Sequence, residues 1–172
     1  MSRQARAIEL DVRVDSELWN DAKETEAVVR RAIARTAATL SLEKAEIAVV
    51  LTDDSTIRAL NRRWRGLDRA TNVLSFPVNH AAGEPPLLGD IVLAYQTIAR
   101  EARAQGKPFA HHLAHLAVHG YLHLVGYDHE DDKDAEQMEA AERKVLRLLA
   151  VPDPYRRIQR SKRSPKRRRS GK

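Results

Sequence analysis

The pattern of apolar and polar residues along the chain predicts a mixture of short strands and longer helices. Residues 8–14 alternate between apolar and polar side chains, as a strand with one buried face does. Further apolar stretches predict strands at 45–52, 72–78 and 89–94. Helices are predicted at 24–40, from Asp53 or Asp54 to 65, at 95–105, at about 110–125 and at 132–149. Gly and Pro residues mark 81–88 as a loop.

Helices and strands mixed in this order indicate an α+β or α/β fold. We expect a single domain with a small sheet of about four strands that helices cover, one of them a helix that carries histidines. The pattern leaves the order of the strands in the sheet open.

Composition narrows the class of protein. A chain of 172 residues is long enough for one domain with one hydrophobic core. It contains no cysteine, which excludes disulfides and thiolate metal ligands and is what a reducing cytoplasm permits. The N-terminal sequence lacks the apolar region of a secretory signal, and no segment approaches the roughly 18 apolar residues of a membrane span. We therefore expect a soluble cytoplasmic protein that does not bind membranes.

The net charge of +6 comes from the C-terminal end of the chain. Ten Lys and Arg residues and no acidic residue follow Asp153, whereas the rest of the chain has 20 basic and 24 acidic residues. We predict a folded domain at residues 1–152 and a disordered basic tail at 153–172. The tail either contacts RNA phosphates or only keeps the protein in solution.

The most informative segment contains three histidines at a spacing that suits one metal ion. His119 and His123 are four residues apart, so a helix places them on one face, one turn apart. Gly126 then offers the left-handed conformation that ends a helix, which lets His129 fold back toward the other two. Gly120 lies between the first two histidines and costs the helix roughly 1 kcal/mol relative to alanine. Either packing compensates for this cost, or a larger side chain would obstruct something close to the metal.

Other histidines extend this series toward the N-terminus. Residues eight apart on a helix are separated by roughly 12 Å, so three successive members cannot bind one ion. The rival pair is His115 with His119, but it lacks a third ligand at a comparable position off the helix. For His111, His112 and His115 we favour the role of ordinary half-buried histidines.

Three neutral histidine ligands suit a single zinc ion and leave a fourth position for water, as in catalytic sites. The spacing matches that of zinc proteases, except that Gly120 stands where those enzymes have a glutamate base. A peptidase is therefore not expected, and the chemistry must use another base or an easier leaving group.

Three sequence motifs resemble one known family. Residues 119–129 read HGYLHLVGYDH, residues 60–77 read LNRRWRGLDRATNVLSFP and residues 88–93 read LGDIVL. Together they are similar to the motifs of the YbeY family of bacterial rRNA maturation endoribonucleases. The resemblance extends over about residues 45–149 and does not include the basic tail. One departure is Asn72, where many members have Asp, so an acid–base role of that carboxylate cannot be transferred.

The resemblance implies one zinc ion on His119, His123 and His129, with Arg65 important beside it. It also implies an endoribonuclease specific for single-stranded RNA that acts on rRNA precursors on the ribosome, in 16S rRNA 3′ end maturation and ribosome quality control. Ribosomal proteins are then partners to be expected. The alternatives are a zinc-stabilised ribosome-assembly factor without physiological nuclease turnover, and a hydrolase of a small substrate.

The residue chemistry supports a catalytic role for Arg65 on its own terms. A phosphodiester hydrolase needs a fixed cation where charge develops on the phosphate, and a planar guanidinium can bind two phosphate oxygens at once. The neighbouring Arg62, Arg63 and Arg69 are expected to be solvated. Asp128 either orients a histidine ligand, caps the backbone or is simply exposed at the surface. Met138 either packs beneath the metal site or, as we favour, lies in the core of the last helix.

Overall fold

The computed structural model describes residues 7–42, 44–79 and 87–156. Within them the strands form one sheet in the order β1-β2-β4-β3. Strands β1 (Ala7–Val14), β2 (Lys44–Thr52) and β4 (Leu87–Ala94) are parallel, and β3 (Val73–Pro77) pairs antiparallel with β4. The short strand β3 therefore forms one edge of the sheet.

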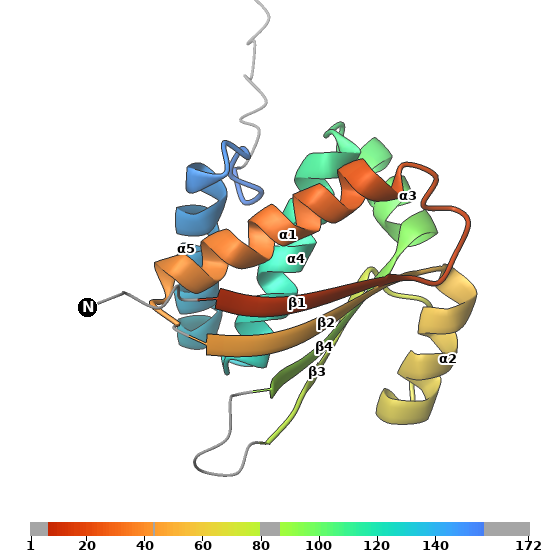
Figure 1. Cartoon of the computed structure of the whole chain (residues 1–172), viewed down its shortest axis with the longest axis horizontal. Coiled ribbons are helices and arrows are strands. Elements are labelled where there is room, and N and C mark those ends of the chain that lie inside the picture. The colour runs from red at the N-terminus through yellow and green to blue at the C-terminus, as the bar shows by residue number, and fades with distance from the viewer. Residues whose placement is uncertain (1–6, 43, 80–86, 157–172) are drawn as a thin grey trace, which may run out of the picture.

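Helices cover both faces of this sheet to different extents (Figure 1). Helices α1 (Ala22–Thr39), α4 (Phe109–Leu124) and α5 (Asp132–Leu148) pack together on one face, and α2 (Asp54–Arg65) lies against the other. Helix α3 (Tyr95–Ala104) follows β4 directly and leads to α4.

The alternation of side chains along β4 explains why two cores form. Ile91 and Leu93 point into the large core under α1, α4 and α5, whereas Val92 joins the smaller core with Ile57 of α2. Neighbouring residues of a strand point to opposite faces, so one buried strand serves both cores.

These observations confirm the expected α+β fold with a four-stranded mixed sheet. Asp53 caps α2 as predicted, since its side chain accepts a hydrogen bond of 2.8 Å from the backbone N–H of Thr56. The predicted loop at 81–88 is wrong at its end, because residues 87 and 88 already belong to strand β4. The rest of that loop lies outside the described residues.

The predicted boundary between domain and tail remains a prediction, since 157–172 lie outside the described residues. Of the predicted tail the structure describes 153–156, where the backbone N–H of Tyr155 donates to Asp153 at 2.8 Å. No helix in the described part of the chain is long and apolar enough to span a membrane.

Helix α4 lies unusually close to the sheet at Gly120. A Cβ atom added there would lie 2.9 Å from Cγ2 of Ile91 and 3.3 Å from Oγ of Ser75. The Ser75 hydroxyl also donates a hydrogen bond of 3.0 Å to the carbonyl of Gly120. Close packing against β3 and β4 therefore explains a glycine inside the helix, the second of the two reasons that the sequence left open.

We predict that Gly120→Ala destabilises the protein. Alanine gains up to about 1 kcal/mol of helix propensity, but overpacking a core costs roughly 1–3 kcal/mol. The melting temperature of the metal-free protein should therefore fall by a few degrees. The cost should shrink in an Ile91→Ala background, because the clashing methyl group is then absent. A Gly120→Ala protein that melts at or above the wild-type temperature would contradict this account.

Candidate metal centre

The three predicted ligands come together at the end of α4. One ligand nitrogen each from His119, His123 and His129 lies within 4.8 Å of the other two. The first two project from the helix, and the third arrives from the segment that follows it. Helix α4 ends at Leu124, and Gly126 takes a left-handed conformation with φ of 98°. This turn reverses the chain, as the sequence predicted.

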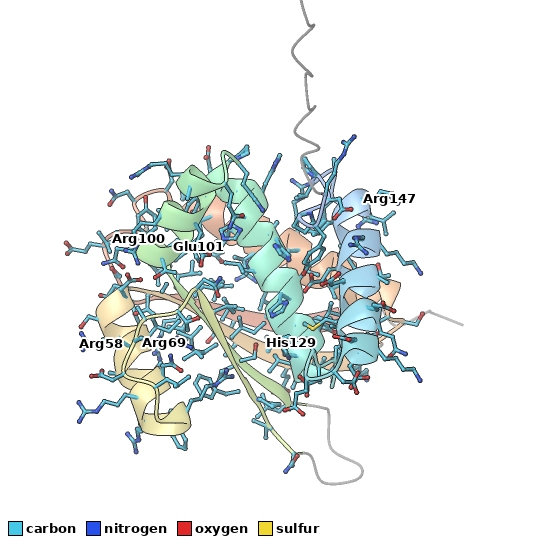
Figure 2. All side chains as sticks on the ribbon, turned by 180° about the vertical axis from the view of Figure 1, so that it is seen from behind. Arg58, Arg69, Arg100, Glu101, His129 and Arg147 are labelled. Carbon is cyan, nitrogen blue, oxygen red and sulfur yellow. The ribbon has the colours of Figure 1, made fainter. Side chains whose placement is uncertain are left out.

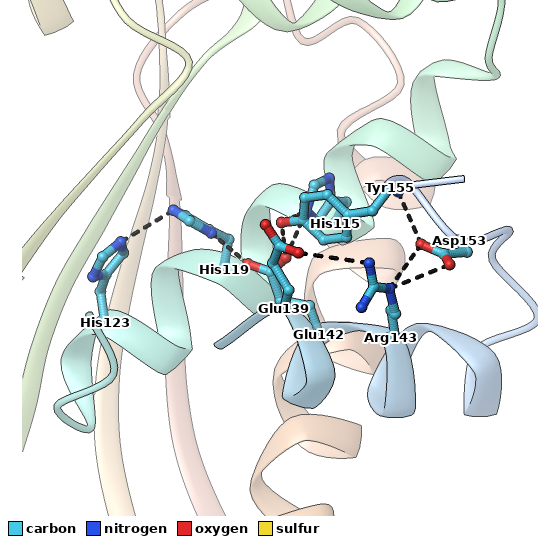
Figure 3. Close-up of polar contacts among 8 residues, drawn as sticks. All are labelled: His115, His119, His123, Glu139, Glu142, Arg143, Asp153 and Tyr155. Carbon is cyan, nitrogen blue, oxygen red and sulfur yellow. Dashed lines mark hydrogen bonds and ion pairs between the residues drawn. The ribbon is translucent and has the colours of Figure 1, made fainter. Parts of the chain in front are cut away.

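Hydrogen bonds fix the orientation of two of the imidazoles. Nδ1 of His123 lies 3.0 Å from the carbonyl oxygen of Tyr127, which can only accept a hydrogen bond. Nδ1 of His119 bonds to Oε1 of Glu142 on α5 (Figure 3). Each Nδ1 therefore carries a proton, which leaves the Nε2 atoms with free lone pairs when the rings are neutral.

These two Nε2 atoms are only 3.1 Å apart. Two lone pairs at that distance repel each other unless a cation lies beside them. Two nitrogens bound tetrahedrally to one zinc ion at 2.0–2.1 Å would be separated by about 3.3 Å, which is close to the observed spacing. The donor set and its geometry thus fit a metal ion bound by His119, His123 and His129.

Burial lowers the pKa of His123, and the neighbouring His119 and His129 lower it further, against the opposing effect of the bond to Tyr127. The ring is therefore kept neutral, which is the form that binds metal.

Glu142 is fully buried and serves as acceptor for three groups. Besides His119, its carboxylate bonds to Nε2 of His115 at 3.1 Å and to the hydroxyl of Tyr155. Burial acts to raise its pKa, but the bonds from His115 and His119 outweigh burial and hold the pKa at about 2. Burial and the bond to Glu142 both raise the pKa of Tyr155, so its hydroxyl remains a donor.

Two of the other histidines have structural partners. Nε2 of His115 contacts the carboxylate of Glu142, as does Nδ1 of His119. These atoms of the rival pair therefore face a carboxylate and not a common metal position. His112 is buried and lies 2.7 Å from Glu101 of α3, and His111 is half-buried on α4. Burial lowers the pKa of His112 in spite of the opposing contact with Glu101.

Arg65 lies at the C-terminal end of α2 and is exposed. Its Nη2 atom donates a hydrogen bond of 3.5 Å to the carbonyl of Ser75 in β3. The hydroxyl of the same serine bonds to the carbonyl of Gly120, which follows the candidate ligand His119. Figure 2, a view from behind, shows Arg58 and Arg69 on the α2 side of the sheet and His129 on the α4 side.

Asn72 has a structural role at the start of β3. Its side-chain amide donates to both oxygens of Glu101, at 2.9 and 3.2 Å, and Glu101 in turn contacts His112. An aspartate would place a second carboxylate against Glu101, whereas the amide supplies a donor. Asn72 is thus matched to its neighbour in this chain.

The structure also shows the contacts of Asp128 and the position of Met138. Asp128 accepts a hydrogen bond of 2.7 Å from the backbone N–H of His129, so it fixes the backbone at a ligand rather than an imidazole. Met138 is buried in the main core.

Glu142 and Tyr155 were missed by the sequence reasoning, although a signal for Glu142 exists. It lies on the same helical stripe as Met138, Val145 and Leu146, which are all buried. A charged residue inside the apolar stripe of an amphipathic helix indicates that a buried partner of opposite charge, or a hydrogen-bond donor, lies beside it. No comparable signal marks Tyr155.

The fold and site define a small α+β protein with a three-histidine candidate metal centre, an arrangement typical of metal-dependent hydrolases. Comparison with known proteins specifies the family. A family model described as Endoribonuclease YbeY matches residues 12–150. The chain therefore belongs to the YbeY family of endoribonucleases.

Relatives of high identity carry the same name. A protein named endoribonuclease YbeY from Bradyrhizobium diazoefficiens is 52% identical over 153 residues, covering 84% of each chain. Another from Rhodopseudomonas palustris strain BisB18 is 53% identical over 152 residues, covering 84% of this chain and 90% of its own. The solution structure of TM1509 from Thermotoga maritima aligns at 26% identity with a TM-score of 0.48, covering 86% of this chain and 99% of that one.

We predict that replacing any of His119, His123 or His129 by alanine sharply lowers the zinc bound by the purified protein. His111→Ala is the matched control, because this residue lies on the same helix outside the three-histidine group. Elemental analysis of the four variants decides the matter. Stoichiometric zinc in His129→Ala would exclude the three-histidine site.

Proposed function

We propose that the protein is a zinc-dependent endoribonuclease that cleaves single-stranded RNA in the cytoplasm. Its substrates are rRNA precursors on the ribosome, where it acts in 16S rRNA 3′ end maturation and in ribosome quality control. The observation that carries the proposal is the close group of three histidine nitrogens in a member of an endoribonuclease family. Ribosomal proteins are the protein partners that this role requires.

His119, His123 and His129 would hold the ion. When bound, zinc supplies Lewis-acid polarisation of a phosphoryl oxygen or a water of lowered pKa. The protein's own contribution is to orient His119 through the carboxylate of Glu142 and His123 through the carbonyl of Tyr127.

Arg65 is proposed as the residue that stabilises charge on the phosphate. It lies at the sheet edge where β3 meets α4, and its exposed guanidinium can reach a ligand there. A fixed cation beside developing negative charge lowers the barrier to phosphodiester cleavage.

The surface around Arg65 supports an unpaired RNA substrate. Arg58, Arg62, Arg63 and Arg69 are exposed on and just after α2. Trp64 is 62% exposed and forms one wall of a groove of about 590 Å³ together with Phe76 and the sheet. An exposed indole can stack on an unpaired base but not on one inside a duplex, which favours single-stranded RNA.

Two alternatives remain to be separated by experiment: a ribosome-assembly factor in which zinc only stabilises the fold, and a hydrolase of a small substrate. The purified protein should cleave single-stranded RNA with zinc and should lose this activity in chelator. Duplex RNA of the same sequence should persist. Zinc-loaded protein that binds single-stranded RNA without cleaving it would favour the assembly factor.

Arg65→Lys sharpens the same assay. Lysine keeps the charge but loses the two-point contact, so cleavage should fall by roughly 10-fold or more. Zinc content and melting temperature should change little, since the side chain is exposed. Arg35→Lys, at an exposed position on α1, is the control and should retain activity. Unimpaired turnover in Arg65→Lys would remove this residue from the mechanism.

The basic sequence at the C-terminus is proposed to bind RNA phosphates electrostatically. Residues 157–172 contain nine Lys and Arg residues and no acidic residue. Deleting them should weaken RNA binding and reduce its salt dependence, because fewer counterions are released. Zinc content and cleavage of short RNA at saturation should persist. Binding across a salt series is the test, and equal slopes for both proteins would favour the solubilising role.

A further inference from the structure

Helix α5 contains a carboxylate that the proposed cleavage chemistry does not use directly. The side chain of Glu142 is 0% exposed, among core residues such as Met138 and Val145. Placing a charged carboxylate in a core is costly unless other groups satisfy all of its oxygens. Its partners therefore indicate what it does.

The two oxygens of Glu142 have different partners (Figure 3). Oε1 faces Nδ1 of the ligand His119. Oε2 accepts from the hydroxyl of Tyr155 and lies 3.1 Å from Nε2 of His115. One oxygen thus acts on the candidate metal centre, while the other holds the carboxylate in position.

The contact with Oε1 determines which nitrogen of His119 is free. A carboxylate accepts, so Nδ1 of His119 must donate, and the lone pair on Nε2 then faces His123. If His119 were the other tautomer, its Nε2–H would occupy the space between the two rings. Only the first tautomer can bind a metal ion through Nε2.

Tyr155 is itself held firmly beside the carboxylate. The guanidinium of Arg143 lies 5.1 Å from the centre of its ring, and Arg143 also pairs with Asp153 at 3.3 Å. Asp153 in turn accepts from the backbone N–H of Tyr155 at 2.8 Å. The segment after α5 is thereby closed over Glu142.

We propose that Glu142 is a positioning residue for the metal centre, whose buried carboxylate fixes His119 as the Nδ1–H tautomer while Tyr155 and His115 hold that carboxylate in place. The proposal rests on the proposed metal-dependent function, because it needs His119 to bind an ion. It adds a residue on α5 and another beyond α5 to a centre whose ligands all belong to α4 and the loop after it.

The first test compares the zinc affinity of full-length Glu142→Gln with that of the wild type, by competition with a chromophoric chelator. The glutamine amide can donate to Nδ1 of His119, which favours the wrong tautomer. Loss of a carboxylate partner of a metal-bound histidine typically lowers metal affinity roughly 10- to 100-fold, and that loss is expected here. Glu136→Gln, an exposed carboxylate earlier on the same helix, is the matched control and should bind zinc as the wild type does.

Two results of this comparison would overturn the proposal. One is wild-type zinc affinity in Glu142→Gln, and the other is an equal loss in the Glu136→Gln control. If the wild type and Glu142→Gln both bind no zinc at the three histidines, the proposed function fails instead. The two failures are therefore distinguishable.

A second test concerns the clamp on Glu142. Tyr155→Phe removes one hydroxyl donor and should lower zinc affinity by less than Glu142→Gln does. In the Glu142→Gln background it should cause little further loss, because both changes act through the same carboxylate. Tyr95→Phe is the matched control, since this half-buried tyrosine packs against Trp19 and Phe109. Full independence of the two losses would overturn the role given to Tyr155.

A third measurement needs no substitution and so does not depend on any variant folding. Nitrogen-15 NMR of the metal-free wild type in alkaline buffer reports which imidazole nitrogen carries the proton. We expect His119 as the Nδ1–H tautomer. A predominant Nε2–H form of His119 would overturn the proposal.

Discussion

The close contact between α4 and the edge of the sheet at Gly120 is the constraint on which the rest of the site depends. A side chain at this position would clash with Ile91, so the helix axis can approach the sheet only because residue 120 has none. The hydroxyl of Ser75 then bonds to the helix backbone beside His119. This buried contact fixes the distance between β3 and the part of α4 that carries two of the candidate metal ligands, His119 and His123.

A buried carboxylate, that of Glu142, also positions the candidate metal centre. The core beneath the histidines contains a carboxylate, and a buried charge is tolerated only when its partners satisfy it. Glu142 meets that condition with two histidines and a tyrosine. The cost of burying it is offset by these bonds, and the result is a histidine ring with one orientation and one tautomer. Packing thus acts at Gly120, and the buried charge acts at the adjacent His119.

The sequence could predict those features that depend on local spacing. His119 and His123 follow from the helical repeat, and the turn at Gly126 that returns His129 follows from the residue type. Strand order could not be predicted from local patterns. In the sheet β2 pairs with β4, although helix α2 and strand β3 lie between them in the chain. Glu142 and Tyr155 act on His119 from 23 and 36 positions away in the sequence, and only the packing of α5 on α4 brings them there. The end of the predicted loop at 81–88 was wrong because pairing with β2 extends β4 to Leu87.

Strand β3 connects the two sides of the site, so its own position must be well defined. Three contacts fix it: Asn72 bonds to Glu101 just before the strand, Ser75 bonds to Gly120, and Gly89 of β4 approaches Phe76 so closely that a Cβ would lie 2.0 Å from its carbonyl oxygen. Arg65 donates a hydrogen bond to the carbonyl of Ser75, in the middle of this strand. Its placement relative to the histidines is therefore set through β3, although the helix that carries it packs on the opposite face of the sheet. A change in any of these three contacts would therefore move Arg65 and the three candidate metal ligands relative to each other without altering either group. The amide of Asn72 matters in this way although it contributes no acid or base.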